Sequence, residues 1–532
     1  MKETTGSKGR LILVGAGPGD PDLITVRGAA ALGQADVVLY DELASHELLS
    51  LVPDHAQCIN VGKRGHDAPT RSQDDVQQLA IRYAAEGLTV VRLKGGDPFI
   101  FGRGGEEASA AVRAGIEWEI VPGVSAALAA PAYAGIPVTD RRHSASFAVV
   151  TGHKDPTRVS RDLSWGALAM AVDTLIVLMG MRNLPEIVEA ILAGGRSPDT
   201  PAAAVMQGTL PEQRVVSAPL KDLPAAVLEA GLGAPASVVV GDVVALREEL
   251  GWWESTPLFG RRVLVTRAPD QSAELASALR AAGAVPDVRP LIELLPCDSA
   301  MEQQAIDQVL QDIESYDDIL FASTNAVRFF FYQAERLGLQ NVAAKVRARI
   351  LCIGARTAQA ALSQGLSAHF VLAGGHGDAE SMLAEIVGTL APSGRRILVP
   401  QSDLGRAILP EGLRVAGARV DAVPFYRNVP ADVDEECLRL DLVADQIDAL
   451  TFTSPSAVER FAGLLDQEAH AAATRCIIGA IGRTTAEALK QAGLRADVIP
   501  SRPDVRALAA ALTDYVSGRS KGREAGAEED PH

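Results

Sequence analysis

The chain has 532 residues, of which 47% are hydrophobic and 22% are charged, and its formal net charge at pH 7 is -17. At roughly 150 residues per domain, this length predicts three or four globular units. The acidic balance argues against nucleic acid as the main partner, because binding phosphates needs a dominant basic surface. The five cysteines form no CxxC pair and the nine histidines no HExxH motif, so we expect neither a disulfide framework nor a metal site.

No segment of the sequence is suited to cross a membrane. The longest apolar run, residues 121–138, is interrupted by Pro122, Pro131 and Pro137 and is too weakly hydrophobic to span a bilayer. Residues 1–10 lack the apolar core of a secretory signal. We therefore expect a cytoplasmic protein.

The first half of the chain has the pattern of an α/β domain. Short runs of valine, isoleucine and leucine that end in glycine alternate with helical lengths of chain, which is typical of buried strands in α/β layers. The expected strands are residues 11–17, 36–41, 89–97, 147–153, 174–180, 202–209 and 237–246. Residues 1–8 form a polar tail that we expect to be flexible, and the pattern predicts a first domain over residues 9–250.

A linker and a second domain are predicted to follow. Residues 251–260, GWWESTPLFG, contain proline, glycine and serine and indicate a joint, which would span roughly 18 Å if it were flexible. A second α/β series is predicted over 261–515. Residues 516–532 are polar and charged, so we expect a disordered tail.

The second half carries an internal repeat. The three pairs of matching blocks occur in the same order and are 262–291 with 396–425, 317–327 with 448–458, and 352–366 with 480–494. The repeat predicts two similar α/β lobes, and a ligand would most naturally lie in the cleft between them.

A glycine-rich turn, GAGPGD at 15–20, follows the first expected strand. A dinucleotide-binding fold is the first interpretation, with Asp41 near the position of its ribose ligand. The spacing fails, since Asp20 stands where the third glycine belongs and Pro18 removes a backbone donor. No phosphate-binding GxxxxGK[ST] loop occurs either.

The segment RLKGGDPFIFGRGGEE at 92–107 is more informative. Gly95 and Gly96 allow backbone to approach a ligand closely at the carboxyl end of a strand, where open α/β sheets bind small molecules. Asp97 is suited to pair with an amine or a ribose hydroxyl. The alternative role of Asp97, as the cap of a turn or helix, does not account for the whole run.

These motifs resemble those of uroporphyrinogen-III C-methyltransferases, which are members of the tetrapyrrole methylase family. The resemblance covers residues 10 to about 253 and rests on GAGPGDPDLIT, ADVVLYDELAS, VGKRGH, VVRLKGGDPFIFGRGGEE, VPGVSAALAAPAYAGIPVT, TGH, LMG, QGTLPEQRVV and PASVVVGDVVAL in that order. It implies S-adenosyl-L-methionine as cofactor. By this resemblance the cofactor pocket is lined by Pro18, Gly95, Gly96, Asp97, Ile100, Ser125, Ala126, Met179 and Gly208.

The resemblance also implies a catalytic pair. Asp41 would accept a proton and Lys63 would donate one, whereas without the resemblance a strand-end cap and a surface lysine would be the simpler interpretations. The acceptor of the methyl groups would be a macrocycle with eight carboxylates. On charge complementarity alone, the candidates for holding those carboxylates are Arg64, Arg103, Arg141 and Arg142. The sequence departs from many relatives at Asp140 and Ser125, where histidine and threonine are common.

The duplicated second half resembles uroporphyrinogen-III synthase over residues 261 to about 515. The resemblance implies that lobe one is built from 261–291 plus 427–515, and lobe two from 292–426. Tyr426 matches an inter-lobe tyrosine and would assist departure of a hydroxyl group. Polar residues at strand ends or helix starts are candidate carboxylate ligands, although serines and threonines at such positions are more often helix caps. The candidates are Arg267, Ser323, Thr357, Ser402, Ser454 and Thr485.

Together the two resemblances predict a bifunctional enzyme. It would close hydroxymethylbilane to uroporphyrinogen III and methylate that product twice to precorrin-2, for sirohaem or cobalamin. Two alternatives remain open: a methylase that acts on a later corrinoid precursor, and a second half that binds tetrapyrrole without catalysis. Members of the family dimerise through the methylase half, so a homodimer is expected.

Overall fold

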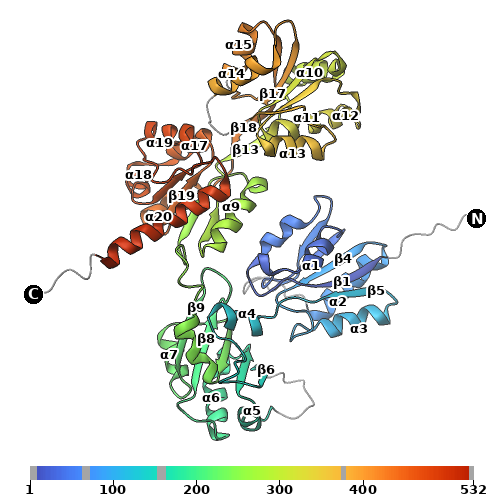
Figure 1. The fold of residues 1–532 in the computed structure, drawn as a ribbon. Helices are drawn as coiled ribbons and strands as arrows, with labels where there is room; N and C mark the ends of the chain where they lie inside the picture. The colour runs from blue at the N-terminus through green and yellow to red at the C-terminus, as the bar shows by residue number, and fades with distance from the viewer. Residues whose placement is uncertain (1–8, 63–71, 153–162, 373–378, 406, 526–532) are drawn as a thin grey trace, which may run out of the picture. The chain divides into compact units, whose positions relative to one another are not determined.

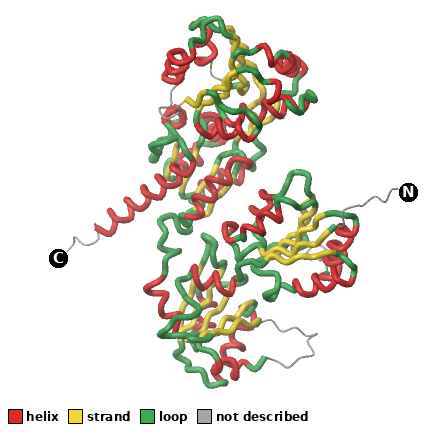
Figure 2. The backbone as a smooth tube through the Cα atoms, turned by 45° about the vertical axis from the view of Figure 1, so that its right-hand side comes forward, coloured by secondary structure: helices red, strands yellow, loops and turns green. Residues whose placement is uncertain are grey.

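The computed structural model describes residues 9–62, 72–152, 163–372, 379–405 and 407–525. The chain divides into two compact units, Met1–Gly260 and Arg261–His532. Helices and strands alternate along both units (Figures 1 and 2), so the predicted α/β fold class is confirmed. Within the described ranges, no helix is both long enough and apolar enough to cross a membrane.

The first sheet of unit 1 is parallel throughout, in the order β3-β2-β4-β1-β5. Its strands are β1 (Arg10–Gly15), β2 (Val37–Tyr40), β3 (Gln57–Asn60), β4 (Thr89–Lys94) and β5 (Glu117–Val121). Because all five strands run in one direction, the loops that follow them meet at a single edge of the sheet. That edge carries the glycine-rich turn, Asp41 and the 95–107 segment.

Helices cover both faces of this sheet. Helix α1 (Val26–Leu32) packs on one face with residues such as Ile12 and Val91, whereas α2 (Gln73–Ala85) and α3 (Gly104–Arg113) pack on the other with Leu11 and Val90. Since side chains alternate along a strand, Arg92 and Lys94 of β4 share the face of α2 and α3.

The second sheet of unit 1 is mixed, in the order β6-β7-β10-β8-β9. Its strands are β6 (Phe147–Thr151), β7 (Thr174–Leu178), β8 (Pro201–Met206), β9 (Arg214–Pro219) and β10 (Ala236–Val240). The 3-10 segments and remaining helices of unit 1 are η1 (Pro21–Leu23), η2 (His46–Leu51), α4 (Ala126–Tyr133), α5 (Trp165–Ala171), η3 (Met181–Asn183), α6 (Leu184–Ala193), α7 (Leu223–Glu229), η4 (Asp242–Leu246) and α8 (Arg247–Leu250). Strands β7 and β8 are both antiparallel to β10, so their carboxyl ends lie at the same edge.

The segment 251–260, which the sequence predicts to be a joint, packs on unit 1. Trp253 is 3% exposed and Leu258 is 1% exposed, and the Trp253 indole Nε1 donates a hydrogen bond to the Leu210 carbonyl at 3.1 Å. The ring of Tyr133 lies 5.2 Å from that of Trp253. Two tryptophans in a ten-residue joint supply enough apolar surface to fix it, so the segment is not a free spacer.

Replacing Trp253 by alanine should destabilise unit 1 by about 3–5 kcal/mol, because it removes a buried indole and leaves a cavity. Scanning calorimetry of the full chain measures the shift. The matched control is Leu228→Ala on α7, where the side chain is 81% exposed and the change should stay within about 0.5 kcal/mol. Equal stability of both variants would show that the joint contributes nothing to the unit.

Unit 2 contains two sheets. The smaller is parallel, in the order β12-β11-β19-β20, and the larger has the order β13-β18-β17-β14-β15-β16, with only β13 antiparallel. The strands are β11 (Arg262–Val265), β12 (Val285–Val288), β13 (Ile292–Pro296), β14 (Asp318–Phe321), β15 (Arg349–Ile353), β16 (Phe370–Leu372), β17 (Arg396–Ser402), β18 (Arg419–Pro430), β19 (Ala449–Phe452) and β20 (Ile477–Ala480). The chain enters the larger sheet by β13 and leaves it by β18, which continues beyond residue 426 to Pro430.

The helices of unit 2 flank its sheets (Figure 1), and α19 and α20 follow the last strand in sequence. They are α9 (Pro269–Ala281), α10 (Ala300–Gln311), η5 (Ile313–Ser315), α11 (Thr324–Arg336), α12 (Val342–Lys345), α13 (Ala355–Ser363), α14 (Ala379–Leu390), α15 (Ile408–Val415), α16 (Glu435–Val443), α17 (Pro455–Leu464), α18 (Gln467–Ala473), α19 (Arg483–Gln491) and α20 (Val505–Ala525).

The internal repeat has a counterpart in hydrogen bonds. The Arg262 N–H donates to Asp448 Oδ2 at 2.8 Å in the smaller sheet, and the Arg396 N–H donates to Asp317 Oδ2 at 2.8 Å in the larger. These residues occupy matching positions of the aligned blocks. Two lobes of similar local design therefore follow from the duplicated sequence.

The end of the described chain differs from the expectation of a disordered tail from 516. Helix α20 continues to Ala525. Leu508, Leu512 and Val516 are buried at a spacing of four residues, and the Ser517 hydroxyl donates to the Thr513 carbonyl at 2.8 Å. A helix that is already anchored can be extended by polar residues because each adds a backbone hydrogen bond.

Candidate active sites

A cradle of glycine backbone lies at the carboxyl edge of the first sheet. The Gly96 N–H donates to the Gly17 carbonyl at 2.7 Å. A Cβ atom on Gly123 would lie 2.3 Å from the Gly96 carbonyl oxygen and 2.7 Å from the Gly15 Cα. Three loops thus approach through backbone alone, which only glycine permits.

Gly123→Ala should weaken binding of S-adenosylhomocysteine at least about tenfold, because the backbone must move apart to admit the methyl group. Calorimetric titration of the full chain measures the affinity. Gly233→Ala is the control, since a Cβ there would meet nothing within 4 Å. If the Gly123 variant bound S-adenosylhomocysteine with unchanged affinity, the cradle would not be the cofactor site.

The Asp97 carboxylate accepts hydrogen bonds from backbone groups of this cradle. Its Oδ1 accepts from the Phe99 N–H at 2.8 Å and its Oδ2 accepts from the Gly123 N–H at 3.0 Å. The capping role named as an alternative is therefore present in the structure. A direct contact between Asp97 and a cofactor stays a prediction.

Several other predicted cofactor residues surround the cradle. A Cβ on Gly96 would lie 3.9 Å from the Ala126 nitrogen, and the Ser125 hydroxyl accepts from the Ala127 N–H at 3.3 Å and so caps α4. A Cβ on Gly208 would lie 2.4 Å from the Ala130 Cβ on the same helix. Pro18 adjoins Gly17 in the glycine-rich turn, and Ile100 is 43% exposed in the loop after Asp97.

Strained backbone marks the carboxyl ends of β7 and β8. Met179, Gln207 and Thr209 have φ values of 54°, 48° and 78°, a region that costs non-glycine residues about 1–3 kcal/mol each. Thr209 is fully buried, and its hydroxyl accepts from the Asp20 N–H at 3.1 Å. This bond ties the glycine-rich turn to the second sheet. Met179 is one of the predicted cofactor residues, and that role stays a prediction. The strained backbone at Gln207 and Thr209 has no signal in the composition of the sequence.

Asp41 lies at the same edge, directly after β2. Its Oδ2 accepts from an Arg92 guanidinium nitrogen at 3.0 Å. Its Oδ1 is buried and has no hydrogen-bond partner among the described residues. A carboxylate held by one oxygen, with the other unpaired, is suited to accept a proton. Arg92 is not one of the site residues predicted from the sequence.

The remaining predicted residues of unit 1 are the proposed proton donor and the arginines proposed to hold carboxylates. Lys63 and Arg64 lie outside the described residues. Arg103 is exposed and pairs with Glu106 at 2.7 Å, and Arg141 is also exposed. Arg142 pairs with Asp140 at 3.2 Å, and this hydrogen bonding lowers the pKa of Asp140, so Asp140 stays ionised.

In unit 2, Tyr426 lies on β18 and is 8% exposed. Its ring stacks on Phe329 with centroids 4.8 Å apart and planes 14° apart. Its hydroxyl lies 3.4 Å from Ser323 Oγ, and Ser402 is its neighbour across the sheet. Burial raises the pKa of Tyr426, although hydrogen bonding with Ser323 and Ser402 acts in the opposite direction. The structure thus brings three predicted residues together.

The other predicted residues of unit 2 have local contacts of their own. Ser454 caps α17 by accepting from the Ala457 N–H at 3.2 Å, as Ser323 caps α11. Thr357 and Thr485 are buried in the first turns of α13 and α19. Arg267 donates to Gln271 at 3.2 Å. Binding roles for these residues remain predictions.

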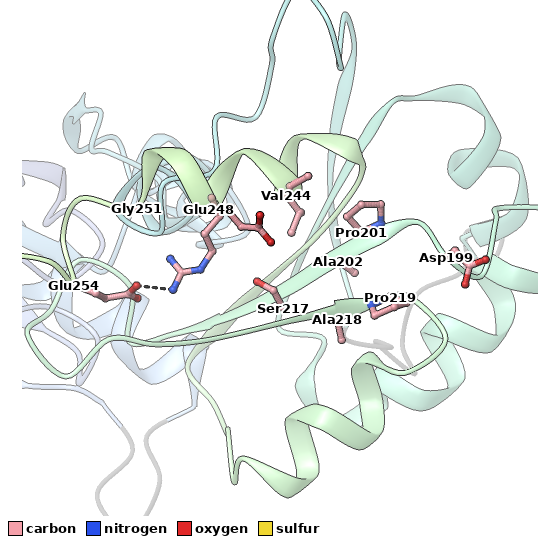
Figure 3. A pocket seen from close by; sticks show the side chains of 12 residues that line it. Asp199, Pro201, Ala202, Ser217, Ala218, Pro219, Val244, Glu248, Gly251 and Glu254 are labelled. Atoms are coloured by element: carbon pink, nitrogen blue, oxygen red, sulfur yellow. Dashed lines mark hydrogen bonds and ion pairs between the residues drawn. The ribbon is translucent and has the colours of Figure 1, made fainter. Parts of the chain in front are cut away.

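A separate pocket of about 580 Å³ occurs in unit 1 (Figure 3). It is lined by Pro201 and Ser217 of the second sheet and by Val244 and Glu248. Because Pro201 begins β8 and Gln207 follows its other end, the pocket lies at the edge opposite the strained residues. No predicted site residue lines it.

Two family models match the chain. Residues 10–224 match Tetrapyrrole (Corrin/Porphyrin) Methylases, and residues 273–510 match Uroporphyrinogen-III synthase HemD. A protein of Ruminiclostridium josui, Porphyrin biosynthesis protein HemD, is 36% identical over 92% of this chain and 94% of its own length. An S-adenosyl-L-methionine-dependent uroporphyrinogen III methyltransferase of Methanosarcina barkeri is 43% identical over 46% of this chain and 96% of its own.

Among solved structures, native uroporphyrin III C-methyl transferase from Thermus thermophilus is 37% identical, covers 44% of this chain and 99% of its own, and has a TM-score of 0.38. The Ruminiclostridium relative spans nearly the whole of both chains. The chain therefore belongs to the tetrapyrrole methylases in its first unit and to the uroporphyrinogen-III synthases in its second. The two resemblances stated from the sequence are confirmed.

Proposed function

We propose that the chain closes hydroxymethylbilane to uroporphyrinogen III and methylates this product twice with S-adenosyl-L-methionine, giving precorrin-2. The methylase is assigned to residues 9–250 and the synthase to 261–515, with precorrin-2 serving sirohaem or cobalamin synthesis. The observation that carries the proposal is the Asp41 carboxylate, which lies at the same sheet edge as the glycine cradle and has one oxygen without a hydrogen-bond partner among the residues that the structure describes.

The cradle suits a cationic, zwitterionic cofactor better than a pyrophosphate. The cations nearest in sequence, Arg92 and Lys94, are buried and engaged by Asp41 and Glu107. These two cations are therefore not free to bind a phosphate. S-adenosyl-L-methionine supplies a methyl group on a positively charged sulfur. The residues proposed to hold it are Pro18, Gly95, Gly96, Asp97, Ile100, Ser125, Ala126, Met179 and Gly208.

Asp41 is proposed to take the proton that the ring system loses at each methylation. Its Oδ1 is the oxygen proposed to do so, because Oδ2 is engaged by Arg92 and Oδ1 has no partner within the described ranges of the chain. Lys63 is proposed as the proton donor, and the ring carboxylates are proposed to pair with Arg64, Arg103, Arg141 and Arg142 by forked hydrogen bonds. We further propose a homodimer formed through the methylase half.

In the synthase half, the Tyr426 hydroxyl is proposed to donate its proton to the departing hydroxyl group of hydroxymethylbilane. The carbon–oxygen bond breaks, water leaves, and a cationic azafulvene remains for ring closure. Ser323 beside the phenol supports this role by fixing its direction. Carboxylates of the substrate are proposed to contact Arg267, Ser323, Thr357, Ser402, Ser454 and Thr485.

The deciding experiment supplies hydroxymethylbilane to the full chain, first without and then with S-adenosyl-L-methionine, and identifies products by isomer and mass. Uroporphyrinogen III is expected first, and its dimethylated product second. Tight binding of uroporphyrinogen III without ring closure would instead indicate a non-catalytic second half. A second half that closes the ring beside a first half that transfers no methyl group would contradict the methylase assignment.

A further inference from the structure

A cluster of buried charged side chains lies behind Asp41. The side chains of Arg92, Lys94 and Glu107 are 7%, 5% and 4% exposed. Arg92 and Lys94 follow Val90 on the α2/α3 face of β4, and Glu107 lies in the first turn of α3. The apolar layer between sheet and helices thus ends in a charged layer at the edge that carries Asp41.

Glu107 fixes this cluster through one oxygen. Its Oε1 accepts from Lys94 Nζ at 3.0 Å, from Arg92 Nε at 3.4 Å and from Gln73 Nε2 at 2.7 Å. Its Oε2 has no hydrogen-bond partner in the described part of the chain. Glu107 is therefore the common acceptor for two buried cations.

Arg92 extends from Glu107 to Asp41. One terminal nitrogen donates to the Leu39 and Leu93 carbonyls at 3.2 and 2.9 Å, and the other donates to Asp41 Oδ2 at 3.0 Å. All three guanidinium nitrogens are thus engaged. Because the group is planar and rigid, a contact at Nε sets the direction of the opposite nitrogen.

Burying these charged groups among apolar residues costs free energy, which a purely structural role does not explain. Arg92 and Glu107 border a small cavity of about 10 Å³ that is otherwise lined mainly by apolar residues, among them Leu13 and Val76. Burial and the neighbouring Arg92 lower the pKa of Lys94, whereas Glu107 opposes that shift. Apolar side chains of similar volume would join α3 to β4 at least as well. A buried ionic network that ends on a reactive carboxylate indicates a functional reason for its charges.

We propose that Glu107, together with Lys94, positions Arg92 so that Asp41 presents Oδ1, the oxygen without a partner in the described structure, to the methylation substrate. Glu107 is a positioning residue that acts through Arg92 and has no contact with substrate. The inference rests on the proposed methylase function and on Asp41 as its proton acceptor. Glu107 in the first turn of α3 would thereby influence proton transfer at Asp41, which follows β2.

The test measures kcat and KM for methyl transfer to uroporphyrinogen III in the full chain, and affinity for S-adenosylhomocysteine by calorimetry. In Glu107→Gln, kcat should fall on the order of 10- to 100-fold, because a misplaced catalytic group costs rate. KM and the S-adenosylhomocysteine affinity should change less than about twofold. Glu189→Gln, an exposed glutamate on α6, should leave all three unchanged.

A double-mutant cycle separates positioning from general damage. If Glu107 acts through Asp41, the Asp41→Asn/Glu107→Gln double variant should have the kcat of Asp41→Asn within about twofold, since the two losses are not additive. The inference would be overturned if the loss of kcat in the double variant equalled the product of the two single losses. A Glu107→Gln variant with wild-type kcat would overturn it as well.

If Glu107→Gln fails to bind S-adenosylhomocysteine, Lys94→Met/Glu107→Gln replaces it in the same cycle, because removing the paired charges together leaves only Arg92 and Asp41 as an ion pair. The same fall in kcat is expected, and normal turnover overturns the inference. A wild-type chain without methyl transfer overturns the proposed function as well. A methylating wild type beside an unimpaired variant overturns the inference alone.

Discussion

Replacing Asp41 by asparagine should lower kcat for methyl transfer by about 10² to 10⁴-fold, the usual contribution of a positioned proton acceptor. Asparagine keeps the size of the side chain and a hydrogen bond from Arg92, but it cannot take up the proton. Ring closure should be unaffected because it belongs to unit 2. Separate assays with hydroxymethylbilane and with uroporphyrinogen III measure the two activities.

The matched control for Asp41 is Asp54→Asn, an exposed carboxylate in the same unit. It should retain both activities. Affinity of the Asp41 variant for S-adenosylhomocysteine should stay within about threefold of wild type, since the cradle is built from other loops. Normal methylation by Asp41→Asn would show that another group receives the proton.

Tyr426→Phe should lower the rate of ring closure on the order of 10²-fold, because the ring can still stack on Phe329 while the proton donor is lost. Methylation of supplied uroporphyrinogen III should not change. The raised pKa of Tyr426 keeps the phenol protonated below about pH 10, the ordinary range for tyrosine. Wild-type ring closure should therefore show no loss from this group between about pH 7 and 9.

Tyr332→Phe on α11 is the control, since Tyr332 is 51% exposed. It should close the ring at the wild-type rate. Loss of methylation in Tyr426→Phe would point to general misfolding, and full ring closure in that variant would assign the leaving-group proton to another donor.

The sequence predicted those features that depend on local pattern. Alternating strand and helix lengths predicted the α/β class, and the duplicated blocks predicted two lobes whose Arg262–Asp448 and Arg396–Asp317 bonds correspond. Glycines at positions 95 and 96 indicated that backbone segments approach closely there. Family resemblance placed Asp41 and Tyr426 in roles that composition alone would not assign.

Features that depend on tertiary register were not predictable in the same way. Arg92 lies on β4 and Glu107 on α3. Their side chains meet only because α3 packs on the face of the sheet from which Arg92 projects. The joint at 251–260 was expected to be a spacer from its proline, glycine and serine, yet Trp253 anchors it in unit 1. Helix α20 continues to Ala525, beyond the buried side chain of Val516. The polar composition of that end did not indicate a helix, because the sequence pattern does not show that the preceding turns are anchored by packing.

The pairing of β11 with β19 has a consequence for how the nascent chain folds. The Arg262 N–H and its Asp448 acceptor are 186 positions apart, while β13 to β18 form a continuous stretch. Strand β11 can pair with β12 early, but at about 5–20 residues per second it would wait roughly 10–40 s for its other partner, β19. The lobe that holds β13 to β18 can mature during translation, whereas the lobe that encloses it in sequence cannot complete its parallel sheet until β19 and β20 have been synthesised.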